Sequence, residues 1–249
     1  SLLTVLIAGL GFHLVLMVGG DGFESVSGKA AGLAALAGGF FLIASLGLYG
    51  AFQRGPVRLV SPIIASFPIL SVIWAASNGV TVTLVQWVAV LAILGGVSVV
   101  AALSDESEDD SPPKLRTVLY ATVSSVGFAG TFAIGQMASE IAHHLPVSLI
   151  TRGTAIVLLV GVILISKVPL WPGRRSLGLL ILMGLADGIA LLCVVAAGGL
   201  PDAQFASVAA SVFGLLTIVI AWALLGEKMT PAQWFWCLVT FGGIGYLAI

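Results

Sequence analysis

The sequence predicts an all-α integral membrane protein built from two inverted repeats of about five transmembrane helices. The first observation is composition: 59% of the 249 residues are apolar and only 8% are Asp, Glu, Lys or Arg. Soluble domains carry about 25% charged residues, so an apolar exterior in a bilayer is the simplest explanation. The second observation is a series of long apolar runs. The third is a short sequence motif that occurs twice in the chain, called the repeated phrase below.

Nine apolar runs approach the length of about 20 residues that a membrane-spanning helix needs. They cover residues 1–18, 30–52, 57–76, 83–103, 117–139, 146–166, 177–197, 203–225 and 231–249. We expect each run to be helical, because a lipid-exposed backbone must satisfy its own hydrogen bonds. A β-barrel would instead show short segments of alternating hydrophobicity.

The repeated phrase is "SNGVTVTLVQW" (77–87) and "LLGEKMTPAQW" (224–234), in which Thr-x-x-Gln-Trp recurs at an offset of 147 residues. Between the two copies lies the acidic segment "SDESEDDSPPKLR" (104–116), which we interpret as a hinge. Residues 1–103 would then form a first repeat and residues 117–249 a second repeat of five spans. The span missing from the first repeat would precede Ser1.

A repeat of five spans has an odd number of membrane crossings, so the second copy must enter the membrane from the opposite side. Inverted repeats of this kind are a recurrent architecture of secondary transporters, in which two halves rock about a central site. The offset therefore predicts both an architecture and a class of function.

Two stretches carry a resemblance to a known family: "LYGAFQRGPVRLVSPIIASFPILSVIWA" from Leu48 and "VVAAGGLPDAQFASVAASVFGLLTIVIAWALLGEKMTPAQWFWCLVTFGGIGYL" from Val194. The chain resembles the EamA type of the drug/metabolite transporter superfamily. Pro68 matches the proline of the family's fourth span, and Gly226 with Glu227 matches its Gly-Glu pair. Family members usually have ten spans, whereas this chain shows nine.

The resemblance implies a secondary transporter that moves a small metabolite, such as an amino acid, an amine or a drug, by alternating access. It implies export, and we expect the bacterial inner membrane. One alternative is a membrane sensor or scaffold that has the fold without transport. Another is an integral-membrane enzyme, although the sequence shows no paired carboxylates and no His-rich motif. We therefore expect no enzymatic activity.

The expected partners are a small-molecule substrate, the lipid bilayer and protons. No nucleic-acid partner is expected, because the net charge is −1. Cys193 and Cys237 lie inside apolar runs and show no metal spacing, so we expect neither a metal nor a cofactor. A monomer and a homodimer both remain open.

Asp187 is the first candidate for the functional site, because it lies near the middle of the run 177–197. An ionisable residue at that depth is costly and marks a functional hypothesis. Asp187 could take up a proton or bind a cationic group. It could also make a structural helix contact beside Gly184 and Gly188. Phe40 occupies the matching position of the first repeat.

Four further residues are candidates for substrate binding or proton coupling. Gln136 could bind substrate or bridge two helices, and His13 could relay protons or be a packing residue. Tyr49 could face a cavity or join the interfacial aromatic belt. Arg152 lies early in its span, where the resemblance implies a gate; the alternative is a side chain that snorkels to the interface.

Pro62 and Pro68 share one span, and each removes a backbone donor. In transporters, broken helices often line the substrate site, although a simple kink is the alternative. Hydroxyl groups that could add polar contacts lie in this span and its partner in the second repeat. They belong to Ser61, Ser66, Ser207 and Ser211.

The positive charges predict an orientation. One side of a nine-span arrangement carries Arg54, Arg58, Lys114, Arg116, Lys167, Arg174, Arg175 and Lys228, and the other carries Lys29 and Arg152. The positive-inside rule places the acidic hinge in the cytoplasm and the C-terminus outside. The resemblance instead implies that both termini are cytoplasmic. Both orientations remain open.

Overall fold

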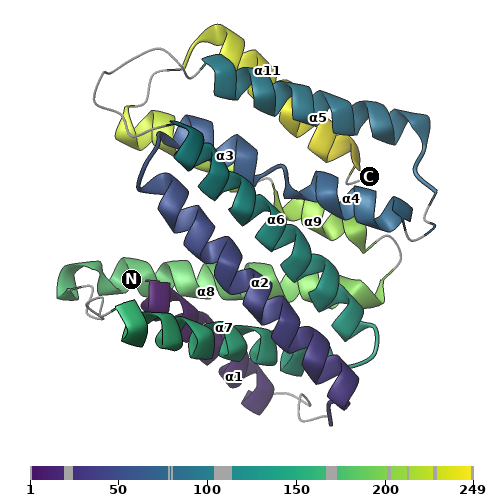
Figure 1. Ribbon diagram of the computed structural model, residues 1–249, viewed down its shortest axis with the longest axis vertical. Coiled ribbons are helices and arrows are strands. Elements are labelled where there is room, and N and C mark those ends of the chain that lie inside the picture. The colour runs from purple at the N-terminus through teal and green to yellow at the C-terminus, as the bar shows by residue number, and fades with distance from the viewer. Residues whose placement is uncertain are drawn as a thin grey trace. The chain divides into compact units, whose positions relative to one another are not determined.

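Helices are the regular elements of this protein in the computed structural model, as Figure 1 shows. The structure describes residues 2–19, 25–77, 79, 81–103, 114–166, 173–200, 203–211, 213–226 and 229–247. No strand occurs in these ranges. The predicted all-α fold is confirmed.

Seven of the predicted runs are single helices. They are α1 (Leu2–Gly19), α2 (Gly28–Phe52), α5 (Leu84–Leu103), α6 (Lys114–Ser139), α7 (His144–Ser166), α8 (Arg174–Ala196), which a short 3-10 turn η1 (Ala197–Gly199) extends, and α11 (Pro231–Leu247). Within the described residues, five helices are long and apolar enough to cross a membrane: α1, α2, α6, α7 and, together with η1, α8. Most of the predicted hinge, residues 104–113, lies outside the described residues, and residues 114–116 belong to α6.

The other two runs are each broken into shorter helices. Residues 57–77 form α3 (Val57–Ile64) and α4 (Phe67–Ser77). Residues 204–225 form α9 (Gln204–Ala210), α10 (Phe213–Ile220) and a π-helical turn, η2 (Ala221–Leu225). Within the described ranges, α3 packs on α10 and α4 packs on α9.

Proline chemistry explains the first break. Pro68 has no N–H group, so the carbonyl of Ile64 receives no helical hydrogen bond from it, and α3 ends at Ile64. The hydroxyl of Ser66 donates to the carbonyl of Ile63 at 2.7 Å, which satisfies another group at the break. The second break has no proline; there Gly214 lets α10 approach the Ala65 side chain closely.

The helix boundaries recur at the same offset as the repeated phrase. Shifted by 147 residues, the starts of α3, α4 and α5 fall on residues 204, 214 and 231. In the structure α9 begins at Gln204, α10 at Phe213 and α11 at Pro231. This correspondence supports the interpretation of the chain as two related halves.

The repeated phrase is one helix-capping motif used twice. Thr83 precedes α5, its backbone N–H donates to Gln86 Oε1 at 2.7 Å, and the N–H of Gln86 donates to Thr83 Oγ1 at 3.3 Å. Thr230 precedes α11 and makes the same pair of bonds with Gln233, at 2.9 and 3.2 Å. This reciprocal arrangement is a capping box, and it accounts for the conserved spacing of Thr and Gln in both copies.

A glycine with a left-handed backbone opens each copy of the turn. The φ angle is 91° at Gly79 and 68° at Gly226, a region that L-residues with a side chain seldom adopt. Glycine at this place commonly follows the end of a helix. Val80 and Glu227, where the two copies differ, lie outside the described residues.

The chain forms two compact units, and neither unit is one of the sequence repeats. Unit 1 comprises residues 1–45 and 130–203, and unit 2 comprises residues 46–129 and 204–249. Each unit therefore takes helices from both halves of the sequence. Helices α2 and α6 contribute to both units.

In unit 1, small residues bring α1 and α8 into close contact. A Cβ atom on Gly184 would collide with the Val5 carbonyl and the Ala8 side chain, and one on Gly188 would press on Gly9. The Gly-x-x-x-Gly spacing is typical of tightly packed membrane helices. The pairing of Val5 with Gly184 and of Gly9 with Gly188 shows that the two helices run parallel.

In unit 2, α5 and α11 pack along their glycines. Gly96 lies against the Trp236 carbonyl and the Thr240 side chain, and Gly243 lies against the Ala89 carbonyl. The contacts run in opposite directions along the two helices, so α5 and α11 are antiparallel. The two capping boxes therefore lie at opposite ends of this helix pair.

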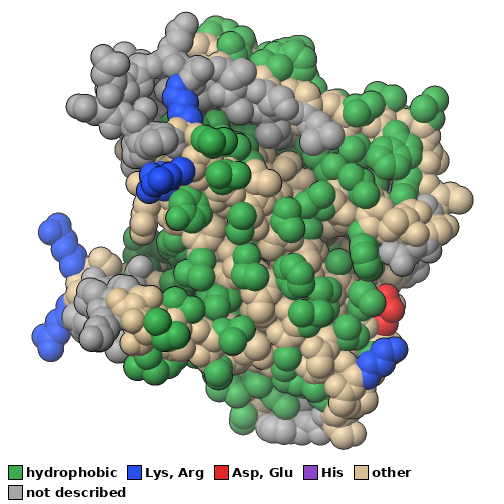
Figure 2. Space-filling model, in the orientation of Figure 1, with side chains coloured by type: hydrophobic (Ala, Val, Ile, Leu, Met, Phe, Trp, Pro, Cys, Tyr) green, Lys and Arg blue, Asp and Glu red, His purple; other side chains and the backbone are tan. Residues whose placement is uncertain are grey.

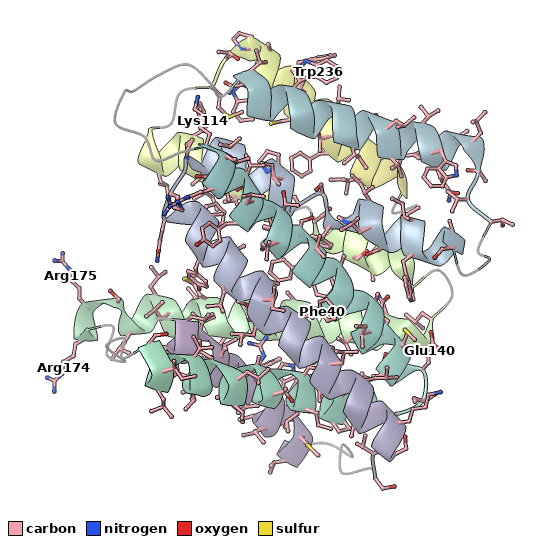
Figure 3. The ribbon with its side chains drawn as sticks, viewed as in Figure 1. Phe40, Lys114, Glu140, Arg174, Arg175 and Trp236 are labelled. Atoms are coloured by element: carbon pink, nitrogen blue, oxygen red, sulfur yellow. The ribbon has the colours of Figure 1, made fainter. Side chains whose placement is uncertain are left out.

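The surface agrees with a bilayer environment. Large apolar side chains are exposed along α7, including Val157 at 70% and Ile165 at 85%. Figure 2 shows hydrophobic side chains spread over the whole described face, with few charged side chains among them. In unit 1, Arg174 and Arg175 extend away from the start of α8, whereas Glu140 lies at the other end of the unit (Figure 3).

Candidate functional site

Unit 1 joins two of the predicted site residues in an ion pair. Arg152, two turns into α7, is completely buried, and its Nη1 lies 2.8 Å from Oδ2 of Asp187 on α8. The Asp187 side chain is 36% exposed. Arg152 therefore does not extend to the membrane surface as a snorkelling side chain would. Its charge lies between apolar helices, where an ionic group is costly unless paired.

His13 on α1 belongs to the same cluster. Its side chain is completely buried, and Nδ1 lies 2.7 Å from the Gly9 carbonyl oxygen. A carbonyl only accepts hydrogen bonds, so Nδ1 carries a proton. Gly9 links the imidazole to the ion pair, because the same residue lies against the Arg152 guanidinium. The structure thus brings together three of the five predicted binding or coupling residues.

Two residues that the sequence analysis missed shape the surroundings of Arg152. A Cβ on Gly9 would lie 2.6 Å from Arg152 Cζ, so only glycine leaves room for the guanidinium there. The ring of Phe41 on α2 lies 5.2 Å from the same carbon, a cation–π contact. Gly9 could have been found from the sequence, because it is a small residue one helical turn before the candidate His13. Nothing in the sequence separates Phe41 from the other phenylalanines.

Some polar atoms of the cluster have no hydrogen-bond partner in the part of the chain that the structure describes. Arg152 Nε, Arg152 Nη2 and His13 Nε2 are buried and have no hydrogen-bond partner among the described residues. Buried polar atoms of this kind normally find a partner in a protein or a water. Two of these three atoms are guanidinium nitrogens, which donate hydrogen bonds and therefore need acceptors.

Gln136 occupies a different part of unit 1. Its Nε2 donates to the Val194 carbonyl at 3.1 Å and to the Ala203 carbonyl at 2.8 Å. Ser139 Oγ donates to the Val195 carbonyl at 2.6 Å. These carbonyls lie at and beyond the end of α8, where helical partners are lacking. The amide thus bridges α6 to the end of α8, as the second interpretation of Gln136 proposed.

The remaining candidates fall in unit 2; Tyr49 lies near the end of α2, and the others lie in or beside the helices α3, α4 and α9 that border the two breaks. Ser61 is buried and its Oγ has no partner among the described residues, whereas Ser66 Oγ lies 3.5 Å from Ser125 Oγ. Ser66 and Ser125 border a half-open cavity of about 170 Å³, whose other lining is mainly apolar. The other candidates in this unit are Tyr49, Pro62, Pro68, Ser207 and Ser211.

No group of three His, Cys, Asp or Glu side chains in the described part of the chain is arranged to hold a metal ion. His143 and His144 are close to one another, with ring centroids 4.2 Å apart. They form a pair at the start of α7 without a third ligand among the described residues.

The EamA-like transporter family matches residues 115–249, which is more than half of the chain. The chain belongs to the EamA-like transporter family. The resemblance inferred from the sequence is thereby confirmed, and the family is part of the drug/metabolite transporter superfamily. This transporter is an integral membrane protein.

One solved chain, described as the crystal structure of a protein, shares the fold of this transporter with a TM-score of 0.73. The two are 16% identical, and the match covers 99% of this chain and 87% of that chain. At this identity the likeness establishes the fold alone. No curated protein matches the chain.

Proposed function

We propose that this protein is a secondary transporter that exports a small metabolite by alternating access, and that Arg152, Asp187 and His13 form its solute-recognising site. The observation that carries the proposal is the fully buried Arg152, which pairs with Asp187 and still has two unpartnered nitrogens. Ionisable groups within membrane-spanning helices commonly mark solute or proton pathways. Bacterial inner membrane is the location that we propose.

The structural alternative is that the ion pair only holds α7 against α8. The matching positions of the first repeat argue against it. Phe40 corresponds to Asp187 and packs on Gly130, and Val5 corresponds to Arg152 and is buried against Gly184 (Figure 3 labels Phe40). Both corresponding positions hold apolar residues, each packed on a different helix, so the first repeat has no ion pair at these positions.

Alternating access is supported by the two halves and by the broken helices. The helix boundaries recur at an offset of 147 residues, and α5 runs antiparallel to α11. In secondary transporters, inverted repeats and discontinuous helices accompany solute sites near the middle of the bilayer. Both broken helices of this protein lie in unit 2.

The test is solute efflux from liposomes that contain only the purified protein. The liposomes are loaded with a mixture of amino acids, amines, sugars and sugar phosphates, and the efflux of each solute is measured by mass spectrometry. We expect at least one solute to leave faster than from protein-free liposomes. The double variant Arg152→Gln/Asp187→Asn, which removes both charges, should lose this efflux.

If no solute leaves faster than the protein-free background, although the protein is folded and correctly inserted, the transport proposal is wrong. That result would favour a membrane sensor or scaffold with a transporter fold. Efflux that the double variant retains in full would keep the transport function but remove the cluster from the site.

A further inference from the structure

We propose that the Arg152 cluster recognises an oxyanion, a carboxylate or phosphate group of the transported solute, and that one proton binds together with it. The inference rests on the proposed transport function and names its substrate class. In the proposed binding step, the solute oxyanion binds the two unpartnered nitrogens of Arg152, Nε and Nη2, beside Asp187. The Asp187 carboxylate then binds one proton from the bulk solution, and this proton is carried across the membrane with the solute.

The donors of Arg152 define the chemistry of the ligand. A guanidinium presents a planar fork of N–H donors, has no acceptor and keeps its charge. Asp187 occupies Nη1, whereas Nε and Nη2 are buried without a partner among the described residues. A fork of this geometry binds a carboxylate or phosphate with two parallel hydrogen bonds. A cationic or purely apolar ligand would leave both nitrogens unsatisfied.

Charge balance is the reason why we expect a proton to bind together with the oxyanion. Arg152 and Asp187 are neutral as a pair, so an added oxyanion would leave a net negative charge inside apolar helices. Such an uncompensated charge is strongly disfavoured. A proton on Asp187 restores neutrality, because Arg152 then carries the positive charge and the solute the negative one. The Asp187 side chain is 36% exposed whereas Arg152 is completely buried, so Asp187 is the member of the pair to which we assign the proton.

The other groups around Asp187 are compatible with this assignment. The titratable residue that α1 contributes is His13, and the one that α7 contributes near the pair is Arg152. From α2 comes the ring of Phe41, and the charged residue of its described part is Lys29, at the beginning of the helix. Arg174 and Arg175 lie at the start of α8, away from its middle.

His13, as a neutral group, is the third member of the Arg152 cluster. Its Nδ1–H donates to Gly9, so in the neutral ring Nε2 is an acceptor. That atom is buried and lacks a partner among the described residues. It can receive an N–H or O–H donor from the solute, such as the hydroxyl of a protonated phosphate, or an ordered water beside the oxyanion.

The first test compares matched solutes in wild-type liposomes. Each pair differs only in the oxyanion: an amino acid with its amide, an amino acid with its decarboxylated amine, and a sugar phosphate with its sugar. We expect the oxyanion member to leave at least about 100-fold faster, because a site built around buried donors rejects an analogue that leaves them unpaired. Equal efflux of both members would overturn the inference while leaving the transport function standing.

The second test measures the charge that crosses the membrane with each solute molecule, in the wild-type protein and in Asp187→Asn. The asparagine side chain is a permanent mimic of the protonated acid. The wild-type protein should move one more positive charge with each solute molecule than Asp187→Asn does. A membrane potential of 100 mV is set by a potassium gradient and valinomycin. One additional charge moved with each solute molecule then changes the ratio of the solute concentrations on the two sides of the membrane about 50-fold. The same accumulation ratio for both proteins would contradict proton binding at Asp187.

A third measurement decides the question if Asp187→Asn does not fold. A pH-sensitive dye trapped in wild-type liposomes should report one proton moved with each oxyanion solute. Solute flux without any proton movement would overturn the proposal. The absence of all flux would refute the transport function itself, so the two failures are distinguishable.

Discussion

At the scale of single residues, Asp187 is one half of an ion pair and not an isolated acid. The sequence places it in an apolar run but cannot reveal that Arg152, 35 positions earlier, meets it at 2.8 Å. Removing one partner of a buried pair costs about 3–5 kcal/mol, because the other charge is left unpaired. Replacing both partners with neutral groups is far less costly.

Asp187→Asn should therefore destabilise the protein more than the double variant Arg152→Gln/Asp187→Asn. The single change leaves the guanidinium of Arg152 buried without its counter-ion. Arg152→Gln alone should have an intermediate effect, because the Asp187 side chain that it leaves unpaired is partly exposed, unlike the completely buried guanidinium. Thermal unfolding of the four proteins in detergent measures the order. Independent, additive effects of the two changes would show that the pair is not coupled.

Gly9→Ala should disturb the cluster without altering any of its charged or polar side chains. The new methyl group would occupy the space of the Arg152 guanidinium, and a displacement of about 1 Å at a recognition site can cost about 100-fold in rate. Gly11→Ala on the same helix is the matched control, because a Cβ there meets open space. Solute efflux measures both variants, and equal efflux would refute this packing role for Gly9.

At the scale of helices, the sequence predicted existence and boundaries well but not contacts. Hydrophobic length reveals a spanning helix directly. Pro62 and Pro68 indicated a break or a kink in their span; α3 ends before Pro68 and contains Pro62, whereas no proline marks the break between α9 and α10. A helix that is apolar on all sides has no stripe to show which face is buried. The partners of Arg152 and Gln136 therefore became visible only in the structure.

The two capping boxes should contribute equally to stability, because their hydrogen bonds are the same. We expect Thr83→Ala and Thr230→Ala each to lower the free energy of unfolding by about 1 kcal/mol, the usual cost of losing a helix N-cap. The two effects should add, since the sites share no partner. Unfolding in detergent measures them; a negligible loss in either variant would contradict the cap assignment.

At the scale of the whole molecule, the compact units and the sequence repeats divide the chain differently. Each unit combines segments from both halves, as expected if two inverted halves interleave. The offset of 147 residues could be found in the sequence because Thr, Gln and Trp are uncommon in such an apolar chain. The division into units depends on contacts between distant segments, which no local pattern records.

The inverted repeat predicts that the two capping turns face opposite sides of the membrane. Thr83→Cys and Thr230→Cys would be made separately in a protein whose Cys193 and Cys237 have been replaced by Ala. A membrane-impermeant maleimide should label one of them in intact cells and the other only in inverted vesicles. Labelling of both from the same side would contradict the inversion.

The central claim is that the cluster of Arg152, Asp187 and His13 in unit 1 recognises the solute of a membrane transporter. The most direct measurement is efflux from solute-loaded liposomes containing either the wild-type protein or Arg152→Gln/Asp187→Asn, both shown to be folded. The account predicts that solutes bearing a carboxylate or phosphate leave through the wild-type protein and stay at the protein-free background with the variant. Equal efflux through both proteins, or none through the wild type, would contradict it.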